Sequence, residues 1–146
     1  MIVKDKERMQ SNAGRLDLLL QDPESLKRYE VEAPEETCRK LSDLGCRFVG
    51  VTLGSKGYIA LADGHLIKKP AYPAETIDTT GCGDLFHAGV AFGIIQGWEA
   101  EKCLDLGAWA AASVSTQMGG RKGIPSLREL EERYLKRKTS TVIQKT

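Results

Sequence analysis

Residues 78–84 read Asp78-Thr79-Thr80-Gly81-Cys82-Gly83-Asp84 and precede a long apolar segment, Leu85 to Gln96. Two glycines in this stretch let the backbone turn sharply and approach a ligand closely. The apolar segment predicts a helix, and the first turn of a helix presents free backbone N–H groups and the positive end of the helix dipole. The stretch therefore predicts a turn that can bind an anion, of which phosphate is the commonest.

Asp84 is open to two interpretations. In the first turn of the predicted helix its carboxylate can simply act as a cap. It also lies beside the predicted anion site, where it could take a proton from a hydroxyl group bound next to a phosphoryl group. On spacing alone the cap is favoured, because short glycine motifs often match by accident.

Apolar patterning on either side predicts strands followed by helices. Strands are predicted over residues 48–53, 58–62, 65–68 and 76–78. Helices are predicted over residues 34–44, 85–96 and 101–118, and a last amphipathic helix opens at residue 126. Near the N-terminus residues 16–20 are apolar, and Asp22-Pro23-Glu24 predicts the start of a further helix. This order of elements predicts one α/β domain.

Several of these segments carry more specific signals. The strand over residues 48–53 is apolar throughout, which is typical of a strand covered on both faces. Asp63-Gly64 is a strong signal for a two-residue hairpin. The helix over residues 85–96 is apolar and rich in small residues, which predicts a buried, closely packed helix. Residues 126–129 form a capping box, and the following helix would carry Leu127, Leu130 and Tyr134 on one side.

Composition limits the classes of protein. The 146 residues are 41% hydrophobic and 28% charged, enough for one domain with a core, and the net charge is +1. A nearly neutral chain does not attract nucleic acid or anionic membranes over long distances. We predict three parts: a poorly defined segment over residues 1–32, the domain over residues 33–138 and a polar tail over residues 139–146.

The cellular compartment and the state of the cysteines follow from the same inventory. No apolar stretch is long enough to cross a membrane, and the charged residues near Met1 make export unlikely, so we predict a cytoplasmic protein. The cysteines are Cys38, Cys46, Cys82 and Cys103. They form no C-x-x-C pair, which predicts reduced thiols and no cysteine metal site.

Three motifs in register resemble the ribokinase, or PfkB, family of carbohydrate kinases. Residues 78–86, D-T-T-G-C-G-D-L-F, are similar to the family signature D-T-x-G-A-G-D-x-F, with cysteine in place of alanine at position 82. Residues 51–57 resemble the family's T-L-G-x-x-G nucleotide loop, and residues 119–125 resemble the loop ending in I-P. The resemblance covers about residues 45–134, most of the chain.

The resemblance implies a ribokinase-like three-layer α/β/α fold, of which this chain holds the C-terminal half only. It implies transfer of the γ-phosphoryl group of ATP to a sugar hydroxyl, with Asp84 as general base. The backbone N–H groups of Gly81, Cys82 and Gly83 would stabilise the phosphoryl charge. ATP would bind at Thr52, Gly54, Ser55, Lys56, Gly57 and Gly83.

Metal ions are also implied by the resemblance. Mg²⁺ would accompany the phosphates. A monovalent cation, usually K⁺, would bind partly through main-chain oxygens at Asp78, Thr80, Val114, Gln117, Gly119 and Gly123.

Five further residues have two interpretations each. His87 could reach the rim of the site, although a hydrogen-bonded core histidine is favoured. Trp109 could border the adenine, although core packing is favoured. Lys56, Arg121 and Lys122 could contact phosphates or could simply be solvated loop residues.

Members of this family are about twice as long and carry the sugar-binding residues and a β-sheet lid in their N-terminal half. The nearest match to their N-x-x-E element is Gln21-Asp-Pro-Glu24. We therefore expect weak or no sugar phosphorylation by this chain alone, with a complementing N-terminal half or self-association as the remedy. A nucleoside kinase of the same family and a non-catalytic nucleotide-binding module are the alternatives.

Overall fold

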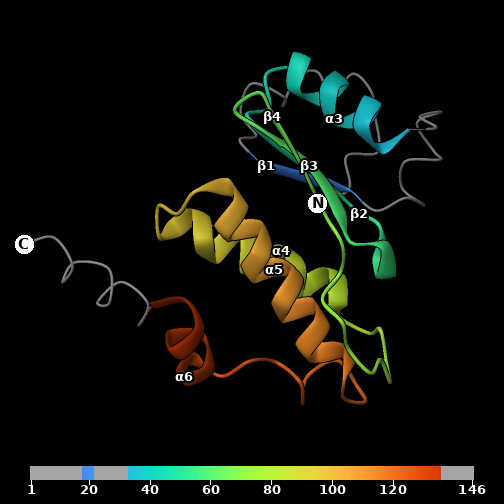
Figure 1. Ribbon diagram of the computed structural model, residues 1–146, viewed down its shortest axis with the longest axis vertical. Coiled ribbons are helices and arrows are strands. Elements are labelled where there is room, and N and C mark those ends of the chain that lie inside the picture. The colour runs from blue at the N-terminus through green and yellow to red at the C-terminus, as the bar shows by residue number, and fades with distance from the viewer. Residues whose placement is uncertain (1–17, 22–32, 136–146) are drawn as a thin grey trace, which may run out of the picture.

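A computed structural model describes residues 18–21 and 33–135 of the chain (Figure 1). The strands are β1 (Leu18–Gln21), β2 (Phe48–Thr52), β3 (Tyr58–Ala62) and β4 (His65–Lys69). The helices are α3 (Pro34–Asp43), the short η1 (Gly54–Lys56), α4 (Cys82–Ile95), α5 (Ala100–Ser115), α6 (Leu127–Leu130) and η2 (Glu131–Leu135). The predicted helix start at residues 22–24 and the tail over residues 139–146 lie outside the described residues.

The four strands form one sheet in the order β1-β2-β3-β4. β1 runs parallel to β2, whereas β2, β3 and β4 form an antiparallel meander. The turn between β3 and β4 places Asp63 at φ 45° and Gly64 at φ 81°. Two successive positive φ angles fit the type I′ turn of tight hairpins, so the predicted hairpin at Asp63-Gly64 is confirmed.

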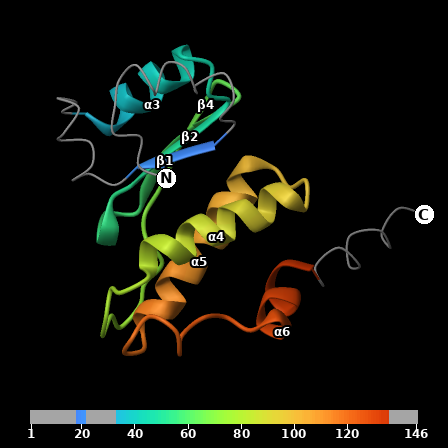
Figure 2. The same ribbon diagram turned by 180° about the vertical axis from the view of Figure 1, so that it is seen from behind.

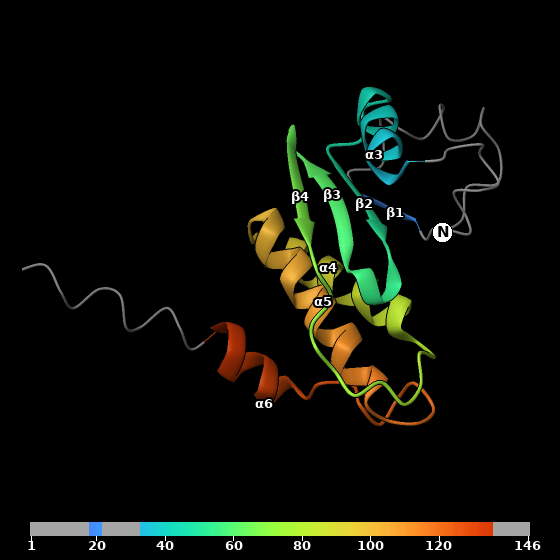
Figure 3. The same cartoon turned by 45° about the vertical axis from the view of Figure 1, so that its right-hand side comes forward.

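Helices cover both faces of the sheet, α3 on one face and α4 with α5 on the other (Figure 3). Cys38 and Leu41 of α3 pack with Val49, Val51 and Leu61 of the sheet. On the opposite face the buried residues are Phe48, Tyr58, Ala60, Ala62, Phe86, Val90, Cys103, Leu104 and Ala108. β2 is therefore covered on both sides, as its apolar sequence predicts, and the fold has three α/β/α layers.

Small residues let α4 and α5 approach closely. A Cβ added at Gly89 would lie 2.8 Å from the Gly107 Cα, and one at Gly93 would lie 2.7 Å from the Cys103 Sγ. The predicted close packing of α4 is thus confirmed, but its predicted complete burial is wrong. Ile95 is 80% exposed and Ile94 44% exposed, because the sheet and α5 cover one side of the helix only.

The last described segment begins as predicted and continues differently. Ser126 and Glu129 form the predicted capping box. The α-helix then ends at Leu130 and a π-helical turn, η2, follows. Tyr134 is buried, but Leu127 is 66% exposed, so the predicted shared apolar side does not form.

Two other predictions differ from the structure. Residues 76–78 form no strand, because the amides of Ile77 and Asp78 both donate to the Ser115 carbonyl at the end of α5. β1 is a strand that the sequence analysis did not predict. The four cysteines are free thiols as predicted, three of them buried and Cys82 half-buried.

Candidate active site

The turn into α4 has the backbone geometry that its glycines predict. Gly81 caps the helix in the left-handed region, at φ 78°. Its own added Cβ would lie 3.3 Å from the Gly120 carbonyl oxygen, so this position favours glycine twice over. A Cβ added at Gly83 would meet no atom within 4 Å. The first turn of α4 is therefore open to solvent at Gly83, and Asp84 beside it is exposed.

Asp78 ties this turn to the loop that leaves α5. Its Oδ1 accepts hydrogen bonds from the Thr80 backbone N–H at 2.9 Å and from the Thr80 hydroxyl at 2.7 Å. Its Oδ2 accepts a hydrogen bond from the Gly119 N–H at 2.8 Å. The bond from Gly119, followed by those from Thr80, lowers the pKa of the Asp78 carboxyl below its usual range. Asp78 is therefore a charged link between two loops.

The residues predicted to surround a monovalent cation come from these two adjacent loops and, for Val114, from the last turn of α5. A Cβ added at Gly120 would lie only 2.8 Å from the Thr80 carbonyl oxygen, so the loops meet backbone to backbone. A Cβ added at Gly123 would lie 2.8 Å from the Val114 Cα. The Gln117 N–H donates to the Val114 carbonyl at 3.3 Å. The structure thus groups all the residues of this prediction at one end of α5.

The predicted nucleotide loop follows β2. Its residues 54–56 form the exposed turn η1, and the Leu53 N–H donates to the Gly57 carbonyl at 2.8 Å. A Cβ added at Gly57 would lie 2.0 Å from the Lys69 carbonyl oxygen, so only glycine fits there. Figures 1 and 2 both show η1 beside the first turn of α4. The glycine-rich turn and the predicted nucleotide loop therefore lie at the same end of the fold.

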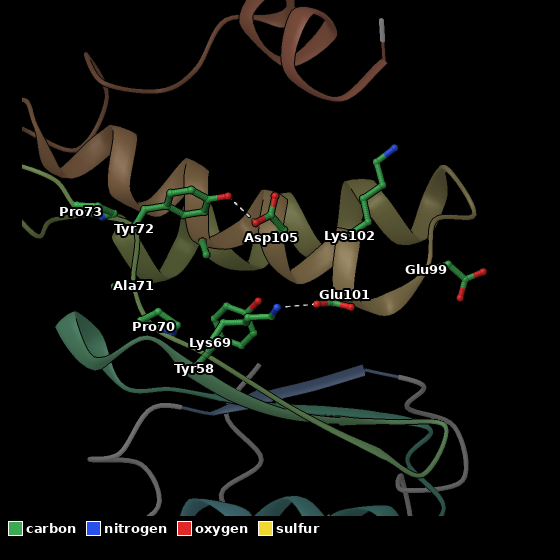
Figure 4. Close-up of a pocket in the computed structure, with 11 residues that line it drawn as sticks. Tyr58, Lys69, Pro70, Ala71, Tyr72, Pro73, Glu99, Glu101, Lys102 and Asp105 are labelled. Atoms are coloured by element: carbon green, nitrogen blue, oxygen red, sulfur yellow. Dashed lines mark hydrogen bonds and ion pairs between the residues drawn. The ribbon is translucent and has the colours of Figure 1, made fainter. Parts of the chain in front are cut away.

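A pocket of about 600 Å³ adjoins this loop. It lies between the β3–β4 hairpin and α5 (Figure 4), and its lining residues are Tyr58, Lys69, Pro70, Ala71, Tyr72, Pro73, Glu99, Glu101, Lys102, Asp105 and Ala108. Lys69 forms an ion pair with Glu101 at 2.8 Å, and the Tyr72 hydroxyl donates to Asp105 at 2.5 Å. Burial, followed by the hydrogen bond to Asp105, raises the pKa of Tyr72.

This pocket could not be predicted from the sequence, because its walls come from three separate segments of the chain. The Pro70-Ala71-Tyr72-Pro73 run, an aromatic residue between prolines, is the one local signal that could have drawn attention to it.

Two of the residues with two interpretations can be compared with the structure. His87 is exposed, so the core interpretation is wrong. Trp109 packs on Tyr134 with ring centroids 5.6 Å apart, as the packing interpretation predicts.

Metal sites built from several acidic or sulfur ligands are absent from the part of the chain that the structure describes. No group of three or more His, Cys, Asp and Glu residues there could hold a metal ion. In the same residues no helix is both long and apolar enough to span a membrane.

Comparison with known proteins places this fold. The pattern of the pfkB family carbohydrate kinases matches residues 17–127. An ATP-dependent 6-phosphofructokinase of Thermoanaerobacterium thermosaccharolyticum is 28% identical over 130 residues, which cover 88% of this chain and 40% of that protein.

Two solved structures share the fold. Arabidopsis thaliana ribokinase complexed with ribose and ATP matches with a TM-score of 0.73 and 29% identity, covering 84% of this chain and 42% of that one. Adenosine kinase from Sinorhizobium meliloti matches with a TM-score of 0.74 and 30% identity, covering 90% and 40%.

The layered fold and its glycine-rich turn define a ribokinase-like α/β/α protein. The chain belongs to the pfkB family of carbohydrate kinases. It spans about two fifths of the length of the relatives described above.

Proposed function

We propose that this chain forms the part of a carbohydrate kinase that binds ATP and transfers its γ-phosphoryl group to a sugar hydroxyl. The observation that carries the proposal is the first turn of α4, where Gly83 is open to solvent and Asp84 is exposed next to it. An anion and an acceptor hydroxyl group can therefore reach the same turn. Membership of the pfkB family supports this chemistry.

In the proposed reaction the residues of this turn divide the work. The N–H groups of Gly81 and Gly83 stabilise the charge on the transferring phosphoryl group, which is the main catalytic contribution in such reactions. The N–H of Cys82 donates to the Thr79 carbonyl at 3.2 Å and would join them only by leaving that partner. Asp84 accepts the proton of the acceptor hydroxyl as its oxygen attacks phosphorus. The bond from phosphorus to the bridging oxygen of ADP breaks, and ADP leaves.

ATP binding is assigned to the loop after β2 and the pocket beside it. Thr52, Gly54, Ser55, Lys56 and Gly57 would contact the nucleotide. The close contact between Gly57 and the Lys69–Pro70 backbone places this loop against the 600 Å³ pocket. Aromatic walls and a small alanine on α5 suit a flat base, so we assign the base of ATP to this pocket.

The residues present also suit the ions that the family resemblance implies. Mg²⁺ usually keeps several waters and binds through phosphate oxygens, so it would enter the site with the phosphates of ATP and leave Asp84 free to act as the base. The K⁺ ion would be held, partly through main-chain oxygens, by Asp78, Thr80, Val114, Gln117, Gly119 and Gly123. When bound, these ions neutralise phosphate charge.

A partner or further polypeptide is also part of the proposal. Seen from behind, α4 lies in front of α5, and β1 lies in front of β2 (Figure 2). The exposed Ile94 and Ile95 are on α4, and within the described residues β1 pairs only with β2. Another part of a kinase fold, covering α4 and extending the sheet beyond β1, would close the acceptor site against water.

Sedimentation of the chain with and without Ile95→Asp tests this surface. A monomer that gains kinase activity when a complementary N-terminal polypeptide is added supports the proposal. If the chain is instead a dimer that the substitution dissociates, the partner at this surface is a second copy of the chain and not an N-terminal polypeptide.

A nucleoside kinase is the second candidate, favoured by the likeness to an adenosine kinase. The acceptor separates the two candidates. Phosphorylation of ribose or fructose 6-phosphate, but not of adenosine, in the complemented protein supports the sugar kinase, and the reverse result supports the nucleoside kinase.

Calorimetric titration with Mg-ATP, with and without K⁺, tests the proposed site. Gly83→Asp adds a negative charge where there is open space, so the fold tolerates it while the charge repels phosphate; Gly83→Ala is the matched control. Binding by the wild type and the control, but not by Gly83→Asp, supports the proposal. Equal affinity in all three contradicts it.

Catalysis by Asp84 needs its own variant. Asp84→Asn keeps the shape of the side chain but removes the base, so turnover by the complemented protein should fall while ATP affinity persists. If turnover persists as well, Asp84 is an ordinary helix cap.

A further inference from the structure

The C-terminal segment of the fold is joined to the wall of the pocket by one group of polar side chains. We call Tyr72, Asp105, Arg133 and Tyr134 the Asp105 group. Tyr72 belongs to the loop after β4, Asp105 to α5, and the other two residues to η2. These three segments are far apart in the sequence, and the Asp105 group fastens them together.

Asp105 accepts a hydrogen bond on each carboxylate oxygen. The Tyr72 hydroxyl donates to Oδ1 at 2.5 Å, and the Tyr134 hydroxyl donates to Oδ2 at 2.7 Å. Arg133 completes the group, because its Nη2 donates to the Tyr72 hydroxyl at 3.0 Å and its Nε donates to the Tyr134 hydroxyl at 3.4 Å. Hydrogen bonds to charged partners are stronger than neutral ones, so this group holds its members firmly.

Aromatic packing fixes the C-terminal side of the group. Tyr134 is only 8% exposed. Its ring stacks on Trp98 with centroids 5.9 Å apart and packs on Trp109. Lys102 lies 3.6 Å above the Trp98 ring and donates a hydrogen bond to the Tyr134 carbonyl at 3.3 Å. The η2 turn is therefore anchored on α5 independently of its contact with Tyr72.

The other side of the group is a wall of the pocket. Both Tyr72 and Asp105 line it, and Figure 4 shows the hydroxyl of Tyr72 pointing to Asp105. Tyr72 also lines a second hollow of about 780 Å³, on the side of η2. Tyr72 therefore lies between the pocket and the η2 segment, and the hydrogen bonds at its hydroxyl tie this part of the pocket wall to that segment.

We infer that Arg133 and Tyr134 are positioning residues for the base end of the nucleotide pocket. They act through Asp105 and Tyr72 and contact neither the phosphates nor the acceptor. The inference rests on the proposed function, because it concerns the same nucleotide. It adds that the C-terminal segment sets how well the protein binds the base, separately from how well it binds phosphate.

This separation gives a test that a purely structural role does not pass. Inorganic tripolyphosphate carries the phosphates of ATP without a base. Loss of a pocket wall should therefore weaken binding of Mg-ATP and leave binding of Mg-tripolyphosphate unchanged. Damage to the whole fold should weaken both.

Tyr134→Phe is the first variant, because it removes the hydroxyl and keeps the ring that packs on Trp98 and Trp109. Arg128→Gln is its matched control, because Arg128 is exposed in the same segment and pairs only with Glu132 among the contacts described. Titration of the whole 146-residue chain should show Mg-ATP binding weakened about three- to tenfold, the net effect of losing one ordinary hydrogen bond. Tripolyphosphate affinity should stay within error.

A double-variant cycle with Tyr72→Phe checks the route of the effect. Because both hydroxyls act through Asp105, the two substitutions together should weaken Mg-ATP binding by less than the product of their separate effects. Independent effects, or an unchanged Mg-ATP affinity in Tyr134→Phe, overturn the inference.

The outcomes also separate this inference from the proposed function. A wild type that binds tripolyphosphate and ATP equally well keeps the phosphate site but has no base pocket, which overturns the inference alone. A wild type that binds neither ligand overturns the proposed function, and the inference with it.

Discussion

The glycines of α4 lie in two very different surroundings. At its first turn Gly83 faces open space, whereas Gly89 and Gly93 face α5 so closely that an added Cβ would lie within 3 Å of another atom. Gly107 on α5 is equally crowded, with the Phe86 carbonyl oxygen 2.7 Å from its added Cβ. The same residue type thus makes room for a ligand at one end of the helix and for another helix in its middle.

This difference shows that the glycines of one apolar helix serve different purposes, some in packing and one in binding. Crowded glycines set the distance between two helices, so their loss should change stability. An open glycine at a helix N-terminus contributes nothing to packing, so its loss should change binding.

The largest expected effect comes from Gly107→Ala. Its Cβ would clash with backbone, so we expect the free energy of unfolding to fall by about 1–3 kcal/mol, as in other overpacked cores. Gly83→Ala should not destabilise the fold, because alanine is about 1 kcal/mol better than glycine in a helix. Urea unfolding of both variants measures the contrast, and equal losses would break the comparison.

Gly120→Ala should have the next largest effect, because it sits where the two site loops meet. Its φ of 65° costs a non-glycine residue about 1–2 kcal/mol, and its Cβ would lie 2.8 Å from the Thr80 carbonyl oxygen. Gly119→Ala is the control, since φ is 90° there but an added Cβ meets nothing within 4 Å. The thermal unfolding midpoint of Gly120→Ala should lie below that of Gly119→Ala. The reverse order would contradict the backbone contact.

A smaller effect is expected from Asp78→Asn, and it should depend on pH. The folded protein lowers the pKa of Asp78, so the carboxylate stabilises the fold above its unfolded pKa of about 3.9. That stabilisation is lost as the pH falls through the lower folded pKa. Urea unfolding should show the variant less stable than the wild type at pH 7, with the difference shrinking toward pH 3. A difference independent of pH would exclude the charge as its cause.

The smallest expected effect concerns the reactivity of two thiols, Cys82 in the open turn of α4 and Cys103 of α5 where it packs against α4. Cys82 lies half-buried in the open turn, and burial followed by the Asp78 charge raises its pKa. It should react with iodoacetamide more slowly than a free thiol, because the thiolate is the reactive form. Cys103, fully buried against Gly93, should react only after the helices separate. Peptide mapping by mass spectrometry measures both rates, and faster labelling of Cys103 would contradict the packing.

Local signals explain most of what could be predicted from the sequence. The Asp63-Gly64 hairpin, the capping box at Ser126 and the turn at Gly81 depend on a few adjacent residues, and all three form. Residues 76–78 look like a strand, but the amides of Ile77 and Asp78 bond to Ser115. That partner lies far away in the sequence.

The features that could not be predicted from the sequence depend on partners that are distant along the chain. β1 has four residues and exists as a strand because it pairs with β2. The all-round apolarity of α4 predicts burial without saying which neighbours cover it. In the candidate site the glycine motifs were visible in the sequence, whereas the Tyr72–Asp105–Tyr134 link joins three distant segments and has no local pattern.

The topology of the sheet has a consequence for the order of folding. β2, β3 and β4 are paired through short connections, and α4 and α5 are joined by a short turn, so these contacts are local in sequence. β1 pairs with β2 across roughly thirty residues, which makes its closure entropically slower. We therefore expect amide hydrogen exchange to protect the meander and the helix pair before β1 joins them. Among the described strands, the parallel β1 would then be the last to dock and the first to detach.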